Sequence, residues 1–216
     1  MKAARALAAL CAAAIVGAGT PARAFYESAE DARFDYYVLA LSWTPTFCAT
    51  HPDERAECGH RRGFAVHGLW PQYAGGGGPE HCGAAGGLDR ETLQRARSVM
   101  PDERLIRHEW IAHGSCSGLS PHDYFLAMIR AAGQLSIPAE FDGEAPHSLT
   151  ASQIVAAFEK ANPSLTARSL VLRCRASDLE EVRICLSRDL HPQPCGRDVR
   201  TRCRSGVLTI GTMRAP

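Results

Sequence analysis

The sequence predicts an α+β fold in which a central, mainly antiparallel β-sheet packs with several α-helices and is stabilised by disulfides. Helix signals are confined to the middle of the chain, and strand signals lie before and after them. Strands that flank a run of helices, rather than alternating with them, favour antiparallel pairing. Hydrophobic residues make up 45% of the 216 residues and charged residues 22%, close to globular averages, whereas nine cysteines are many for such a chain.

Residues 1–24 have the features of a secretory signal peptide. Lys2 and Arg5 precede an apolar run over residues 6–18, which is too short to span a membrane, and a small-x-small cleavage site follows. Residues 25–216 contain no repeat or linker, so we expect one domain there. We therefore expect a secreted or periplasmic protein, and no membrane partner, because no later segment is long and apolar enough for a transmembrane helix.

Removal of this leader changes both the charge and the cysteine count. The leader contains three basic residues and no acidic ones, so the formal net charge of +1 becomes −2. A chain with that charge is not a polycation, and any contact with nucleic acid must come from local sites. One cysteine is also removed, and the eight that remain predict four disulfides in an oxidising compartment.

Two strands and a loop are expected before the helices. The apolar run over residues 37–43 predicts a buried strand, and Gly63–His67 predicts a second one. A glycine-rich loop with four consecutive glycines then follows over residues 73–88. We expect Cys82 to tether this loop.

Four helices are expected in the middle of the chain. Asp89, Ser120 and Thr150 can each accept a hydrogen bond at a helix N-terminus, and Thr150 with Gln153 also forms a capping-box pattern. Pro101-Asp102 starts a further helix. The four segments are residues 89–100, 101–113, 120–135 and 150–161.

The last third of the chain returns to strand patterns, at residues 169–174, 181–186 and 207–210. Its four cysteines allow three connectivities. A hairpin of the first two strands would favour a nested pairing, but the residues alone leave the choice open.

Two segments concentrate residues that can do chemistry. The first is FAVHGLWPQ, with His67 at the end of a predicted strand, and the second is HEWIAHGSC, with His108, Glu109 and His113 in the last turns of a predicted helix. At roughly 100° per residue, Glu109 and His113 are about 40° apart and share a helical face. We therefore expect the carboxylate and the helix dipole together to raise the pKa of His113.

A zinc protease does not fit the second segment. Such a helix needs the pattern H-E-x-x-H, and this chain has one residue more between its histidines. Three imidazoles and one acid, without a nucleophilic serine or a free thiol, suit acid–base catalysis instead. RNA supplies its own nucleophile, the 2′-hydroxyl, so the set fits a ribonuclease that needs no metal or other cofactor. The other histidines are predicted to lie on the surface: His51, His60, His81, His122, His147 and His191.

These two segments resemble the signatures of the ribonuclease T2 family, H-G-L-W-P and H-E-W-x-K-H-G-[TS]-C. Further similarity lies in LSWTPTFC, in MPDERLIRHEW and in EVRICL, so that the resemblance spans residues 36–210. It implies a secreted, metal-independent endoribonuclease of α+β fold, and we expect the protein to be a monomer. Such an enzyme cleaves single-stranded RNA through a 2′,3′-cyclic phosphate.

The resemblance also implies roles for the residues of the two signatures. His113 would be the general base for the 2′-hydroxyl, and His67 the general acid for the 5′-oxygen that leaves. His108 would bind the phosphate, and Glu109 would support the transition state.

Three residues of the first signature and its continuation are candidates for substrate binding. The resemblance implies that Trp70 stacks on a base, and that Gln72 and Tyr73 read base edges. Trp110, in the second signature, is expected to pack in the core instead.

The family pattern further implies the disulfide pairing. The expected pairs are Cys48 with Cys58, Cys82 with Cys116, Cys174 with Cys203, and Cys185 with Cys195.

One position departs from the family pattern. The family has a lysine where this chain has Ala112, and the lysine is thought to stabilise negative charge at the scissile phosphate. Arg107 lies about 140° from that position on a helix, which makes it a poor substitute. The alternative is therefore a catalytically weakened RNA-binding or host-interaction protein on the same fold.

Overall fold

The computed structural model describes residues 34–59, 63–83, 86–143, 145–204 and 206–212. The predicted signal peptide and its cleavage site lie outside the described residues, as does His60. None of the described helices is long and apolar enough to cross a membrane.

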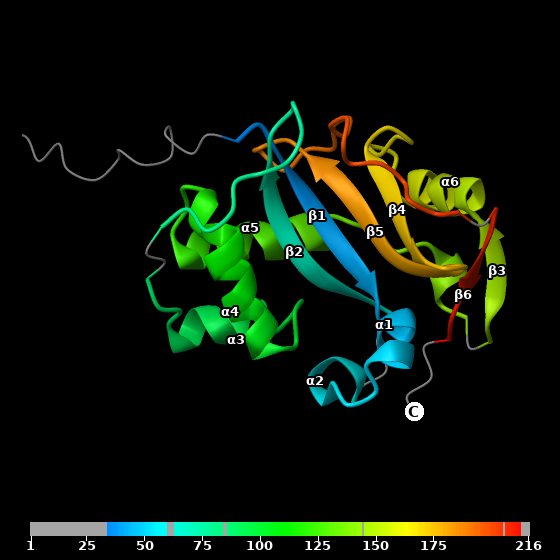
Figure 1. Cartoon of the computed structure of the whole chain (residues 1–216), viewed down its shortest axis with the longest axis horizontal. Helices are drawn as coiled ribbons and strands as arrows, with labels where there is room; N and C mark the ends of the chain where they lie inside the picture. The colour runs from blue at the N-terminus through cyan, green and yellow to red at the C-terminus, as the bar shows by residue number, and fades with distance from the viewer. Residues whose placement is uncertain (1–33, 60–62, 84–85, 144, 205, 213–216) are drawn as a thin grey trace, which may run out of the picture.

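A six-stranded sheet forms the centre of the fold (Figure 1). Its order is β2-β1-β5-β6-β3, and β4 also pairs with β5. All pairings are antiparallel except a single parallel position between β5 and β6, which confirms the predicted α+β class. The strands are β1 (Tyr36–Trp43), β2 (Phe64–Gln72), β3 (His147–Thr150), β4 (Leu170–Arg175), β5 (Asp178–Leu186) and β6 (Val207–Ile210).

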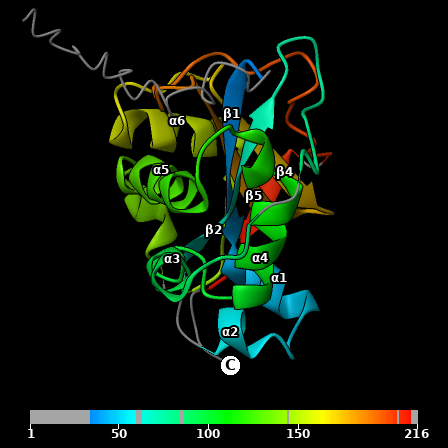
Figure 2. The ribbon, with the colours of Figure 1, turned by 90° about the vertical axis from the view of Figure 1, so that its left-hand side faces the viewer.

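Two of the longer helices cover one face of this sheet. Figure 2 shows α5 and α6 against the sheet seen edge-on, and both views place α4 beside the free edge of β2. The helices are α1 (Thr44–Thr50), α2 (Arg55–Cys58), α3 (Arg90–Ala96), α4 (Glu103–Ala112), α5 (Pro121–Gly133) and α6 (Ala151–Ala161). Two single turns of 3₁₀-helix, η1 (Gly114–Cys116) and η2 (Ala139–Phe141), follow α4 and α5.

The two faces of the sheet bury different amounts of apolar surface. Side chains alternate along a strand, so Leu39 and Leu41 of β1 join the main core, where α5 and α6 contribute Phe125 and Phe158. Val38 points to the other face and belongs to a small second cluster around Cys185. We call this second side the open face.

The helix caps confirm the predicted starts. Asp89 accepts a hydrogen bond from the backbone N–H of Thr92, and Asp102 accepts one from that of Arg104. Thr150 and Gln153 form the expected capping box at the start of α6.

Some boundaries differ from the predicted ones. β1 ends at Trp43, as expected, but Thr44 and Pro45 then lie in the first turn of α1, where proline is well tolerated, so this short helix was missed. The short α2 and β3 were missed as well. The helix that begins after Asp89 ends at Ala96 rather than at residue 100, and β2 continues to Gln72 because it stays paired with β1.

The disulfides have the pairing that the resemblance implies. The bonds join Cys48 to Cys58, Cys82 to Cys116, Cys174 to Cys203 and Cys185 to Cys195. The second bond fastens the glycine-rich loop to η1, directly after α4, so Cys82 tethers the loop as expected. The last two are nested around the β4–β5 hairpin, as expected.

Candidate active site

A β-bulge in β2 places His67. The register between β1 and β2 shifts after Ala40: Gly68 lies opposite Ala40 and Val66 opposite Leu41, so His67 is an extra residue between them. Bulges redirect side chains and are frequent beside active sites. Here the bulge lets Val66 join the main core while His67 lies on the open face, near Trp70.

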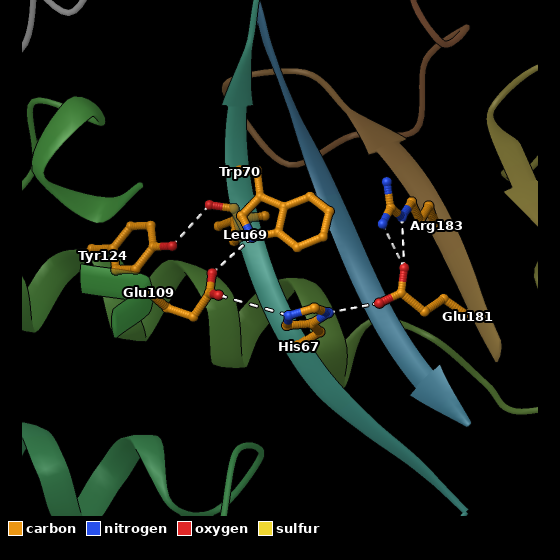
Figure 3. A network of polar contacts seen from close by, with 7 residues as sticks. All are labelled: His67, Leu69, Trp70, Glu109, Tyr124, Glu181 and Arg183. Carbon is orange, nitrogen blue, oxygen red and sulfur yellow. Dashed lines mark hydrogen bonds and ion pairs between the residues drawn. The ribbon is translucent and has the colours of Figure 1, made fainter. Parts of the chain in front are cut away.

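Glu181 holds the His67 ring from one side. Nδ1 of His67 lies 2.6 Å from Oε1 of Glu181, and Oε2 of Glu181 accepts hydrogen bonds from Arg183 at 2.6 and 2.8 Å (Figure 3). Burial by itself would raise the pKa of Glu181, but the hydrogen bond from His67 and the charge of Arg183 outweigh it and lower the pKa to about 2. Glu181 is therefore a carboxylate anion fixed behind the imidazole.

Glu109 faces the other ring nitrogen of His67. Its Oε1 is 3.9 Å from Nε2 of His67, and its Oε2 accepts a hydrogen bond of 2.7 Å from the indole N–H of Trp70 (Figure 3). Glu109 is 1% exposed, and this burial raises its pKa to about 7 although His67 and Trp70 oppose the shift. At neutral pH the carboxyl group is thus close to its titration midpoint.

The pKa of His67 is raised above its ordinary value. Burial alone would lower it, but the hydrogen bond and charge of Glu181, together with the charge of Glu109, more than compensate. His67 therefore favours the imidazolium form, which can donate a proton.

Gly68 makes the contact between Trp70 and Glu109 possible. A Cβ atom on Gly68 would collide with Oε2 of Glu109 and with Nε1 of Trp70. The glycine of the first signature therefore has a packing reason, since any side chain there would separate the indole from the carboxylate.

His113 lies at the C-cap of α4, where its environment differs from the predicted one. Burial lowers its pKa to about 4, and the nearby charge of Glu80 only partly opposes this effect. The expected rise in pKa is wrong, because Glu109 turns towards His67 and Trp70, and burial outweighs the helix dipole. Nδ1 of His113 is buried and has no hydrogen-bond partner among the described residues.

His108 lies at the edge of the same region. It is exposed, and with His67 it lines an apolar cavity of about 410 Å³. Phe47 and His51 stack on each other at a ring distance of 4.4 Å and line that cavity too. His51 is thus on the surface, as predicted, but it borders the candidate site.

The other predicted residues lie as follows. Trp70 is half-buried, and its ring is 5.1 Å from that of His67 and 5.5 Å from that of His113. Gln72 ends β2 on the same side, and Tyr73 is exposed at the start of the glycine-rich loop. Trp110 is buried in the main core, as expected, and donates to the carbonyl of Gly86.

The position of the missing lysine is covered. Ala112 is 3% exposed, and its carbonyl accepts a hydrogen bond from the backbone of His81, next to the disulfide at Cys82. Arg107 does not replace the lysine, because it pairs with Glu103 on an exposed part of α4. In the described part of the chain, no cluster of three His, Cys, Asp or Glu side chains could hold a metal ion.

Glu181 and Arg183 were not predicted as site residues. Both occur in the EVRICL segment, at alternate positions of the predicted strand over residues 181–186, whose other residues are apolar. Two charged side chains on one face of such a strand were the available signal. What the pattern could not supply was the partner, which is 114 residues away in the sequence.

Comparisons with known proteins relate this chain to ribonucleases. The model of the Ribonuclease T2 family matches residues 34–195. A ribonuclease of Aeromonas hydrophila is 47% identical over 95 residues, which are 44% of this chain and 43% of that protein. A probable ribonuclease of Haemophilus influenzae is 30% identical over 161 residues, 67% of this chain and 56% of that protein. The chain thus spans about half the length of these curated relatives.

Solved structures show the same fold. An RNase-related protein from Calystegia sepium has a TM-score of 0.68 and 22% identity, covering 84% of this chain and 98% of that one. Ribonuclease MC1 from the seeds of bitter gourd has a TM-score of 0.65 and 20% identity, covering 81% of this chain and 99% of that one.

Proposed function

This chain belongs to the ribonuclease T2 family, and from that premise we propose that it is an endoribonuclease. It cleaves single-stranded RNA through a 2′,3′-cyclic phosphate, without a metal ion or cofactor. The observation that carries the proposal is that the pKa values of two imidazoles beside one indole ring are shifted in opposite directions. The pKa of His113 is lowered to about 4 and that of His67 is raised. One is therefore neutral and the other charged at the same mildly acidic pH.

His113 acts as the general base. Its imidazole is unprotonated above about pH 4, and it takes the proton of the 2′-hydroxyl as the 2′-oxygen attacks phosphorus.

His67 acts as the general acid. Glu181 occupies its Nδ1, so Nε2 is the nitrogen that gives its proton to the departing 5′-oxygen. Because Glu181 keeps its negative charge, the imidazolium form of His67 remains available until the pH exceeds its raised pKa.

Glu109 and His108 stabilise the phosphorane. With a pKa of about 7, the Glu109 carboxyl group carries a proton at acidic pH and can donate it in a hydrogen bond to a phosphoryl oxygen. His108 is exposed beside the same cavity and contacts the phosphate from the solvent side.

The two sides of the scissile bond have different surroundings. Trp70 offers an indole face on which a base can stack. The apolar cavity that His67 and His108 line suits the nucleoside that leaves with the 5′-oxygen, because His67 protonates that oxygen. Nucleotide binding by a related fold supports this arrangement, since the solved structure of RNase NT contains 5′-AMP.

Export is part of the proposal. The leader pattern of residues 1–24 and the four disulfides favour a secreted or periplasmic protein that forms one domain over residues 25–216. All residues assigned to the reaction come from one chain, so a monomer suffices.

The alternative, an RNA-binding protein with weakened catalysis, is favoured by Ala112 alone. A cleavage assay on RNA homopolymers in EDTA distinguishes the two. We expect turnover with 2′,3′-cyclic phosphate ends. Binding without turnover would favour the alternative, and turnover that EDTA abolishes would contradict the metal-free mechanism.

A further inference from the structure

A second cavity, of about 260 Å³, lies on the open face of the sheet. Arginines from three parts of the chain line it. Arg173 comes from β4, Arg183 from β5, and Arg200 with Arg202 from the segment that follows Cys195. We call this cavity the arginine cleft; its polar lining residues are Gln72, Arg173, Arg183, Asp198, Arg200 and Arg202.

The backbone holds this cleft in place. Arg173 and Arg202 form a parallel bridge, and the N–H of Arg202 donates to the carbonyl of Leu172 at 3.0 Å. Disulfides at Cys195 and Cys203 fasten both ends of the segment to β5 and β4. The cationic side chains are thus brought together by a fixed part of the fold and not by a free tail.

The charges of the cleft do not cancel. Arg183 pairs with Glu181, but neither Arg173 nor Arg202 has a carboxylate partner among the described residues. Asp198 is the one acidic residue among the described residues that line the cleft, and its carboxylate accepts a hydrogen bond from the N–H of Gly77 at 2.7 Å. An excess of guanidinium groups in a concave polar surface is suited to an anion, and above all to phosphate.

The cleft continues directly from the candidate active site. The guanidinium carbon of Arg183 lies 4.7 Å from the centroid of the Trp70 ring. Gln72, two residues beyond Trp70 on β2, lines the cleft itself. Asp198, Arg200 and Arg202 also line an adjoining cavity of about 400 Å³ that reaches Gly75. A strand with a base on Trp70 therefore has a cationic path leading away from the reacting phosphate.

We propose that the arginine cleft binds a non-scissile phosphate of the RNA strand, so that the enzyme prefers oligonucleotides to dinucleotides. The inference rests on the proposed RNA cleavage. RNA is favoured over an acidic protein because the cleft adjoins Trp70 and the reacting groups, where a continuous strand must pass.

The test compares Arg173→Gln/Arg202→Gln with Arg90→Gln/Arg130→Gln, which removes two exposed helix arginines away from the cleft. Both pairs change the net charge equally. We expect the first pair to lower kcat/KM on a 12-nucleotide RNA at least about tenfold more than on a dinucleotide. We also expect the slope of log(kcat/KM) for the 12-nucleotide RNA against log salt concentration to become less negative by about 0.7 for each lost phosphate contact. Equal losses on the two substrates, or equal losses in the two variant pairs, would overturn the proposal.

A binding measurement separates this inference from the cleavage reaction. A 12-nucleotide RNA with a 2′-O-methyl group at each position cannot be cleaved, and its Kd should rise about tenfold or more in Arg202→Gln, a single exposed change with little risk to folding. An unchanged Kd refutes the cleft even if cleavage is normal. If the wild-type protein cleaves neither substrate, the proposed function fails while the binding result still decides on the cleft. Stronger competition by polyglutamate than by RNA would also refute it, in favour of an acidic protein.

Discussion

His67 lies on the sheet between two carboxylates, whereas His113 lies at the end of a helix with its Nδ1 unpartnered among the described residues. Both rings are near Trp70 and both are partly buried. Burial lowers the pKa of each imidazole, but only His67 has a carboxylate anion, that of Glu181, within hydrogen-bond distance to oppose the effect. The comparison teaches that the protonation of a buried histidine is decided by which charged group reaches it, and not by burial alone.

The largest expected effect comes from removing either of the two imidazoles. We expect His113→Ala or His67→Ala to lower kcat by roughly 100-fold or more, the usual effect of losing a positioned acid or base. The melting temperature of His113→Ala should change little. The measurement is steady-state cleavage of an RNA homopolymer. His122→Ala serves as the control, because His122 is in α5 and belongs to neither signature, and near-normal turnover by His113→Ala would refute its role as base.

Removing the negative charge of Glu181 tests why the pKa of His67 differs from that of His113. We expect Glu181→Gln to lower the pKa of His67, so that activity is lost at a lower pH on the alkaline side, by about one pH unit. Activity at neutral pH should fall roughly tenfold, and less at pH 5. The readout is the pH profile of kcat/KM. Glu181→Asp should restore part of the alkaline limb, which a purely structural role of the carboxylate would not predict.

Glu181 also links stability to pH. Its pKa is lowered to about 2, so its contribution to folding stability is fully present above its ordinary pKa. That contribution is lost as the pH falls from the ordinary pKa towards about 2. The raised pKa of His67 acts in the opposite direction, because its contribution is present below the ordinary value and is lost as the pH rises.

In the unmodified protein, the different pKa values of His113 and His67 should appear as the two limbs of one pH profile. Catalysis needs His113 neutral and His67 protonated. Activity should therefore rise as the pH passes about 4 and fall once it exceeds the ordinary range of a histidine, giving an optimum on the acid side of neutrality. Cleavage rates over pH 3 to 9 test this expectation. A rate that still increases at the alkaline end would contradict it.

The smallest expected effect comes from placing a cation next to His113. A phosphorane carries more negative charge than the ground-state diester, so we expect Ala112→Lys to raise kcat several-fold while changing KM less. Because Ala112 is covered, the new side chain has to extend beyond the segment near His81. The measurement is kcat and KM with the melting temperature as a check on folding. A folded variant with unchanged or lower kcat would mean that the cation adds nothing at this position.

The sequence predicted the sheet and the main helices, and it singled out four candidate site residues but not all of their contacts. Helical spacing placed Glu109 and His113 on one face, and it could not reveal that Trp70 and His67 lie opposite Glu109. The predicted direction of the His113 pKa shift was wrong for the same reason. The helix dipole and the neighbouring acid can be deduced from local sequence, whereas burial depends on the whole fold. Glu181 was missed because a strand partner far along the chain leaves no local spacing.

The bulge at His67 also limits how this region can change in evolution. In β2 the core residues Val66 and Leu69 are three positions apart, where a regular strand would place them two or four apart. Insertion or deletion of a single residue between them would restore strict alternation and turn either the histidine or the core leucine to the wrong face. Substitutions can accumulate along much of the strand, but the length of this short stretch is fixed. Relatives that retain the reaction should therefore differ here in residue type and never in residue number.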